Sequence, residues 1–185
     1  METPRLDSRG DNDLTDNNTT PSATGKISNG SHHSEAGLEI LSITENRPDL
    51  IMGDIDFTLQ AWVNLDDKSS NHIFIERWFG TVNEYKLVYT IATDRFEFIV
   101  VSQGGAQDSI AASTLGSPST GTWYLIHAWH DAVGNQIGIS VNAGTADTKA
   151  YSAGVAASDG EFDLGLHYNG ILDEVGIWKR VLSSA

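Results

Sequence analysis

Carboxylates, imidazoles and indoles are the side chains in this sequence that could do chemistry. Residues 11–16, Asp-Asn-Asp-Leu-Thr-Asp, begin like an EF-hand loop, in which carboxylate and amide oxygens coordinate calcium. Such a loop needs glycine at its sixth position and glutamate at its twelfth, where this chain has Asp16 and Ser22. These residues therefore do not form an EF-hand.

An acid near the end of the chain, Asp173, lies in a segment whose alternation predicts a β-strand. Ile171, Val175 and Ile177 share its parity, so we expect the Asp173 side chain to point inward with them. A buried carboxylate needs hydrogen bonds, a cation or a proton. Two explanations stay open for Asp173: a bound cation, or the backbone N–H groups of a neighbouring loop.

The other potential nucleophiles and bases do not assemble into a catalytic motif. The chain has no cysteine and no Gly-x-Ser-x-Gly elbow. His127 and His130 are three residues apart on a predicted strand, so their side chains leave opposite faces and cannot easily share a metal ion. A hydrolase triad therefore has no support.

Aromatic side chains offer a different chemistry, because flat rings stack on sugars while acids and amides bind the hydroxyl groups. Trp78 and Tyr168 lie at the edges of predicted loops, and Trp178 lies on the face opposite Val175 and Ile177. We predict Trp78, Tyr168 and Trp178 as ligand-binding residues. The alternative for each is an ordinary place in the core.

The elements that must position these side chains are strands, because the apolar residues repeat every second position. This alternation is clearest in the segments 57–65, 85–91, 96–100 and 137–141. Turn-forming residues such as Gly104-Gly105 and Asn169-Gly170 separate the apolar segments. The pattern predicts an all-β, antiparallel two-sheet sandwich of roughly ten to twelve strands without a long helix.

The composition changes near residue 37. Residues 1–37 contain only six of the residue types Ala, Val, Ile, Leu, Met, Phe, Trp, Tyr and Cys, too few to build a separate core. We therefore expect residues 1–37 to form a polar, loop-rich segment that packs on or flanks the sandwich. Residues 38–185 are expected to form the sandwich itself, with both parts belonging to one domain.

Four segments in order resemble the laminin-G-like, concanavalin A-like jelly-roll family. They are GDIDFTLQAWV from residue 53, GTWYLIHA from 121, QIGISVNAG from 136 and GILDEVGIWKRVLS from 170. An early LDSRGDN loop from residue 6 is similar to the family's first loop. The resemblance implies a concanavalin A-like jelly roll in which Trp62 and Trp123 occupy framework positions.

The resemblance also implies a structural calcium ion between the early loop and the closing strand. Asp7 or Asn12 would coordinate that ion together with Asp173. This is the only cofactor that we predict.

Enzymes of the laminarinase-like branch carry an E-x-D-x-E motif along one strand, and the nearest match here is at residues 161–165. Glu161 and Asp163 are present, but the third acid is replaced by Gly165, which has no group that can transfer a proton. We therefore expect no glycosidase activity, and read the two acids as solvated.

Charge excludes one class of partner. The chain has 11 Lys and Arg against 25 Asp and Glu, a net charge of −14, which disfavours binding to a phosphate backbone.

No apolar segment could span a bilayer, so we expect no membrane insertion. The first residues do not resemble a signal peptide.

These observations favour a non-catalytic binding module that recognises a glycan or a surface protein, located outside the cell or on a virion surface. The alternative is a structural or decoration protein of a phage, a virus particle or a surface assembly, with a homo-oligomer or a virion protein as its partner. Saturable glycan binding separates the first reading from the second.

Overall fold

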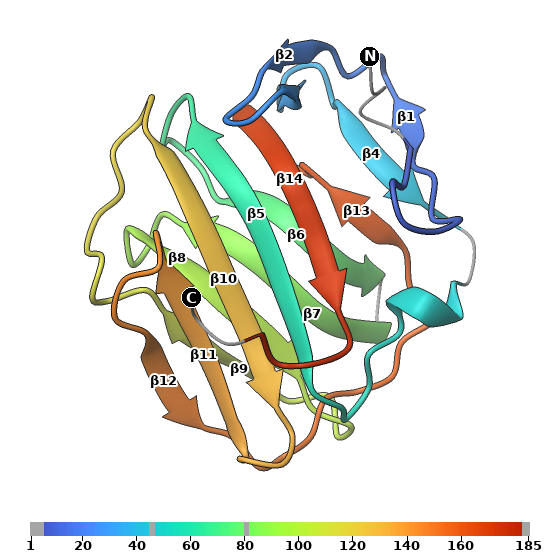
Figure 1. The fold of residues 1–185 in the computed structure, drawn as a ribbon, viewed down its shortest axis with the longest axis vertical. Coiled ribbons are helices and arrows are strands. Elements are labelled where there is room, and N and C mark those ends of the chain that lie inside the picture. Colours follow the sequence, from blue (N-terminus) through green and yellow to red (C-terminus); the bar gives the residue numbers. More distant parts are fainter. Residues whose placement is uncertain (1–5, 45–46, 80–81, 183–185) are drawn as a thin grey trace.

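The computed structural model is an all-β sandwich of two antiparallel sheets, as predicted (Figure 1). It describes residues 6–44, 47–79 and 82–182, and within these each sheet has seven strands. Sheet A runs in the order β1 (Thr15–Asn17), β4 (Ile40–Ile43), β13 (Phe162–Leu164), β6 (His72–Phe79), β7 (Val82–Thr90), β8 (Arg95–Val101) and β9 (Gln107–Ala111). Sheet B runs in the order β12 (Asp147–Ala150), β11 (Gln136–Val141), β10 (Trp123–Asp131), β5 (Phe57–Leu65), β14 (Gly170–Trp178), β3 (Asn29–His33) and β2 (Ser22–Thr24). A 3-10 turn, η1 (Pro48–Leu50), precedes β5.

The core lies between the two sheets and is built by the alternation seen in the sequence. In β10 every second residue, from Tyr124 to His130, is buried, and the residues between them are partly exposed. The odd-numbered residues of β5, from Phe57 to Leu65, are fully buried on the same inner face. Because a strand directs successive side chains to opposite faces, one face of each sheet forms the core and the other faces outward.

The N-terminal segment supplies strands to both sheets. β1 pairs with β4 in sheet A, whereas β3 pairs with β14 in sheet B, with His33 opposite Gly170. The composition change at residue 37 therefore does not mark a structural division, and the polar segment completes the edges of the sandwich.

A β-bulge in β14 changes which side chains face the core. The register shifts between Asp173 and Gly176, and Glu174 has a left-handed backbone with φ 48°. Before the bulge Asp173 lies opposite Trp62 on the outer face, and after it Ile177 lies opposite Leu59 on the inner face. The prediction that Asp173 shares the inner face with Ile177 is therefore wrong, because an extra residue in one strand reverses the parity.

Candidate functional site

A groove of about 420 Å³ crosses the outer face of sheet A over β4, β13 and β6. Its lining consists of Asn17, Ile40, Ser42, Thr44, Glu76, Trp78, Glu161, Asp163 and Leu166. The register explains its centre, because Asp163 on β13 lies opposite Ser42 on β4 and Glu76 on β6. Directly opposed residues of antiparallel strands share a face, so these three side chains form a row across the sheet.

Trp78 forms one wall of the groove. It lies two residues after Glu76 on β6, so both side chains emerge on the outer face, and its ring is half-buried. Lys86 on β7 places its Nζ 3.9 Å from the centre of the Trp78 ring, a cation–π contact. Lys86 comes from β7, whereas the groove lies on the β13 side of β6, so this cation is not part of the lining.

The two central carboxylates are deeply buried for charged groups. Glu76 is 3% exposed and Asp163 is 8% exposed. Neither accepts a hydrogen bond from another residue in the described part of the chain. Burial raises the pKa of Glu76 to about 7, with the nearby Lys86 opposing this shift and Asp163 adding to it. Burial also raises the pKa of Asp163 to about 6, and the charge of Glu161 contributes to that rise.

This arrangement offers a flat apolar ring beside hydrogen-bond acceptors that lack donors. An indole can stack on the C–H face of a sugar ring, and carboxylates accept hydrogen bonds from hydroxyl or amine groups. Asn17 and Ser42 add polar groups at the far side, joined by a hydrogen bond from Asn17 Nδ2 to Ser42 Oγ of 2.8 Å. The groove is thus suited to a small polar ligand with one flat apolar face.

Sequence reasoning missed Glu76 and misjudged Asp163. Asp163 was expected to be solvated beside Glu161, but it lies buried in the middle of the groove. Glu76 belongs to a distant segment, and only the pairing of β6 with β13 brings it beside Asp163. The one signal in the sequence was the position of Glu76, an acid that directly follows the apolar run Ile73–Ile75.

Trp178 lies on the other side of the molecule. It is half-buried on the outer face of sheet B, opposite Thr58 of β5. Trp78 and Trp178, predicted together as ligand-binding residues, therefore lie on opposite outer faces and cannot contact one small ligand.

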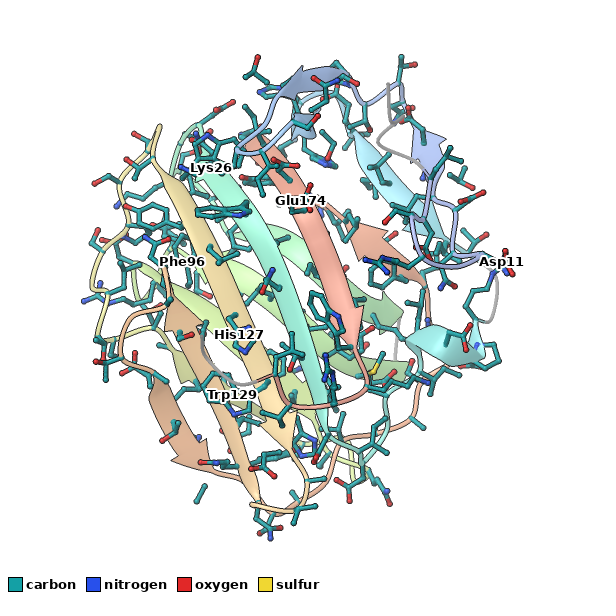
Figure 2. The ribbon with its side chains drawn as sticks, viewed as in Figure 1. Asp11, Lys26, Phe96, His127, Trp129 and Glu174 are labelled. Carbon is teal, nitrogen blue, oxygen red and sulfur yellow. The ribbon has the colours of Figure 1, made fainter. Side chains whose placement is uncertain are left out.

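Trp62, Trp123 and Trp129 share the outer face of sheet B with Trp178. Figure 2 shows Trp129 beside His127 on β10, with Lys26 over the upper part of the same face. The chain after β14 crosses this face (Figure 1), and Leu182 N donates a hydrogen bond to Thr58 Oγ1. Part of the tryptophan-rich face is thereby covered by the protein itself.

Tyr168 cannot be a surface platform, so this prediction is wrong. Its side chain is fully buried, and its hydroxyl donates a 2.7 Å hydrogen bond to the carbonyl of Asn64. The ring packs edge-on against Phe74, with 5.1 Å between the ring centres. Although Tyr168 belongs to a connecting segment in the sequence, that segment turns inward and closes one end of the core.

Asp7 and Asn12 form a self-contained loop. The Asp7 carboxylate accepts hydrogen bonds from the backbone N–H groups of Arg9 at 2.8 Å and Asn12 at 3.3 Å. Burial alone would raise the pKa of Asp7, but these hydrogen bonds outweigh it and hold the pKa below the usual value of 3.8. Both carboxylate oxygens of Asp7 are thus satisfied by the backbone of the same loop.

Asp173 is buried because the turn between β2 and β3 covers it, although it faces outward. Its Oδ2 accepts a hydrogen bond from Ile27 N at 2.9 Å, and its Oδ1 accepts one from Glu174 N at 2.9 Å. Backbone N–H groups therefore supply the hydrogen bonds that the buried Asp173 carboxylate needs. This is the second of the two explanations given for Asp173 above.

Asp7, Asn12 and Asp173 do not fit a shared calcium ion. Both oxygens of Asp173 and both oxygens of Asp7 already accept backbone hydrogen bonds within separate loops. Over residues 6–44, 47–79 and 82–182, no three His, Cys, Asp or Glu side chains come close enough together to hold a metal ion.

Comparison with known families agrees with this architecture. The model of the Concanavalin A-like lectin/glucanases superfamily matches residues 42–185. The chain belongs to this family. The match begins at β4, so the strands β1, β2 and β3 of this concanavalin A-like protein lie outside the matched region.

Solved structures with low sequence identity share the fold of this concanavalin A-like protein. The binding domain of Paraclostridial Mosquitocidal Protein 1 aligns with a TM-score of 0.74 and 14% identity, over 96% of this chain and 47% of that chain. Domain 4 of AbnA, a GH43 extracellular arabinanase from Geobacillus stearothermophilus in complex with arabinotriose, aligns with a TM-score of 0.67 and 14% identity, over 90% and 78% of the two chains.

A third structure concerns botulinum neurotoxin type C, whose cell entry depends on interaction with two ganglioside molecules. It aligns with a TM-score of 0.71 and 11% identity, over 93% of this chain and 44% of that chain. The present chain thus spans less than half of the two toxin chains. A search of curated proteins found no match. In the described ranges no helix is both long and apolar enough to cross a membrane.

Proposed function

We propose that this chain is a non-catalytic module that binds saccharides in the groove on the outer face of sheet A. The observation that carries the proposal is Trp78 beside Glu76 and Asp163, two buried carboxylates that accept no hydrogen bond from the described residues. A sugar would stack on the indole and donate its hydroxyl hydrogens to the carboxylates. Such a ligand would supply the donors that the protein lacks.

The solved structures with the same fold support the proposal of saccharide binding. The arabinanase domain is a separate domain with bound arabinotriose, and the botulinum toxin interacts with gangliosides. Both are ligands outside the cell, so we further propose that this chain acts at an extracellular or virion surface. The ligands of those proteins are theirs, and the groove described above is the basis for assigning one here.

Gly165, which stands where the E-x-D-x-E motif has its third acid, supports a non-catalytic role. Gly165 has a left-handed backbone with φ 78°, and a side chain there would collide with the ring of His33. A glycosidase of the E-x-D-x-E type needs an acid at this point, and the local fold excludes one. The acids of the groove would therefore serve recognition.

The decisive experiment is a glycan array followed by calorimetric titration of the best saccharide. We expect saturable binding by the wild-type chain and a loss of at least about tenfold in affinity for Trp78→Ala, since aromatic anchors dominate small binding sites. Trp178→Ala, a tryptophan on the opposite face, is the matched control and should bind as wild type.

Binding that survives Trp78→Ala, or a chain that binds no saccharide, would contradict the proposal. The same samples test the alternative, a structural or decoration protein of a particle or surface assembly. That role is favoured by the partly exposed tryptophans on sheet B, which are Trp62, Trp123 and Trp129. It predicts that light scattering shows a symmetric oligomer and that the chain binds no saccharide.

A further inference from the structure

The charged side chains that line the groove are all acidic. Three carboxylates line it, those of Glu76, Asp163 and Glu161, and the lining includes no lysine or arginine among the described residues. Lys86 is the nearest cation on the adjacent strand, but its ammonium lies over the Trp78 ring. A ligand entering the groove therefore meets an excess of negative charge, which Lys86 offsets in part at Glu76.

The burial of the two central acids makes this charge costly. Glu76 and Asp163 are each more than nine-tenths buried, line the groove and accept no hydrogen bond from the described residues. A buried carboxylate without hydrogen bonds destabilises the folded state unless a counter-ion offsets its charge, and of these two acids Lys86 acts on Glu76. A positively charged donor would remove this cost, whereas a neutral hydroxyl would remove only part of it.

From this we infer that the groove selects a saccharide bearing a protonated amine, such as an oligomer of glucosamine, over neutral or acidic saccharides. The inference rests on the proposed function and specifies its ligand. Trp78 would stack on the sugar ring, and Glu76 and Asp163 would together hold the ammonium group. Sialylated or uronic saccharides would be repelled by the same carboxylates.

The selectivity has a pH dependence that follows from the groups facing the groove. These are Glu76 from β6 and Asp163 and Glu161 from β13 and its approach, while β4 contributes the uncharged Ile40 and Ser42. Lys86 on β7 lies outside the lining and acts on Glu76 from the neighbouring strand. Burial places the pKa of Asp163 at about 6 and that of Glu76 at about 7. Between pH 5 and pH 7 both acids lose their protons to a growing extent, so affinity should rise with pH for as long as the amine of the ligand keeps its proton.

The test compares two oligosaccharides that differ only in acetylation. The full chain is titrated calorimetrically with glucosamine tetramer and with N-acetylglucosamine tetramer, at pH 5 and pH 7. We expect the amine form to bind about tenfold more tightly at pH 7, as one charge-assisted hydrogen bond would produce, and this preference to shrink at pH 5. The acetylated form should show little change with pH.

Glu76→Gln and Asp163→Asn should each remove the preference while the acetylated tetramer still binds. Glu174→Gln, an exposed acid on sheet B, is the matched control and should keep the preference. Melting curves of all variants show whether they are folded, and the pH comparison on the wild type needs no variant.

The outcomes separate the two proposals. Equal affinity for both tetramers, lost in Trp78→Ala, would overturn the inference and leave saccharide binding standing. Absence of binding by any saccharide would overturn the proposed function and the inference with it. An oligolysine peptide that binds as tightly as glucosamine tetramer would show that the groove recognises amines rather than amino-saccharides, and would also overturn the inference.

Discussion

At the scale of single residues, chemically similar side chains have opposite roles according to the face they occupy. Trp78 is on an outer face and lines a groove, whereas Tyr168 is fully enclosed and hydrogen-bonded to the backbone. Both are aromatic and both lie near the end of a predicted strand. Burial therefore separates a candidate binding residue from a structural one.

Replacement of Tyr168 by phenylalanine should affect stability alone. The change removes the hydrogen bonds that the hydroxyl donates to the carbonyls of Asn64 and Ile171. We expect the free energy of unfolding to fall by about 1–2 kcal/mol, measured by denaturant titration. Saccharide affinity should stay at the wild-type value. A loss of affinity without a loss of stability would show that Tyr168 contributes to ligand binding after all.

At the scale of elements, the bulge in β14 decides how the β2–β3 turn is held. The bulge follows Asp173, whose carboxylate receives the N–H of Ile27 from that turn. Gly25 in the same turn packs directly against the Asp173 carboxylate and has no room for a side chain. The turn is thus stabilised by an acid that belongs to the last strand.

Replacement of Asp173 by alanine should loosen this turn. Two backbone N–H groups would lose their acceptor, and we expect a loss of about 1–3 kcal/mol in the free energy of unfolding. Glu174→Gln, at the exposed neighbouring position, should stay within about 0.5 kcal/mol of wild type.

Chelation tests the calcium prediction in the same samples. Because the carboxylates of Asp7 and Asp173 are already hydrogen-bonded in separate loops, EDTA should leave the melting temperature unchanged. A decrease in the wild type that is absent in Asp173→Ala would instead show calcium bound at this residue.

At the scale of the whole molecule, buried titratable groups set how stability changes with pH. Burial raises the pKa of Glu76 from 4.5 to about 7 and lowers that of His33 from 6.5 to about 4. Folded Glu76 keeps a proton that the unfolded chain loses between pH 4.5 and pH 7, so its contribution to stability falls as pH rises. His33 acts in the opposite sense, and its contribution is lost as pH falls from 6.5 towards 4.

Glu76→Gln isolates the first of these effects. The amide cannot ionise, so the variant should match the wild type near pH 4.5 and exceed it at pH 8 by about 2 kcal/mol. Thermal unfolding at both pH values measures the difference, and His33 cancels because both chains contain it. A variant that is equally stable or less stable than wild type at pH 8 would show that Glu76 is already compensated, for example by Lys86.

The alternation of apolar residues was enough to predict the sandwich. In β5 and β10 each inner position is apolar or aromatic apart from His130, and a period of two admits only a strand with one buried face. The resemblance of four segments in order predicted the family, which the match over residues 42–185 confirms. These features are local, so they could be predicted from neighbouring residues.

The candidate site depended on contacts that the sequence does not encode locally. Glu76 and Asp163 become neighbours only because β6 pairs with β13, and one extra residue in β14 turns Asp173 outward. Trp78 could be singled out from its type and its position, but its partners could not. Periodicity describes which face a residue occupies within one strand, whereas the pairing of distant strands decides which side chains share that face.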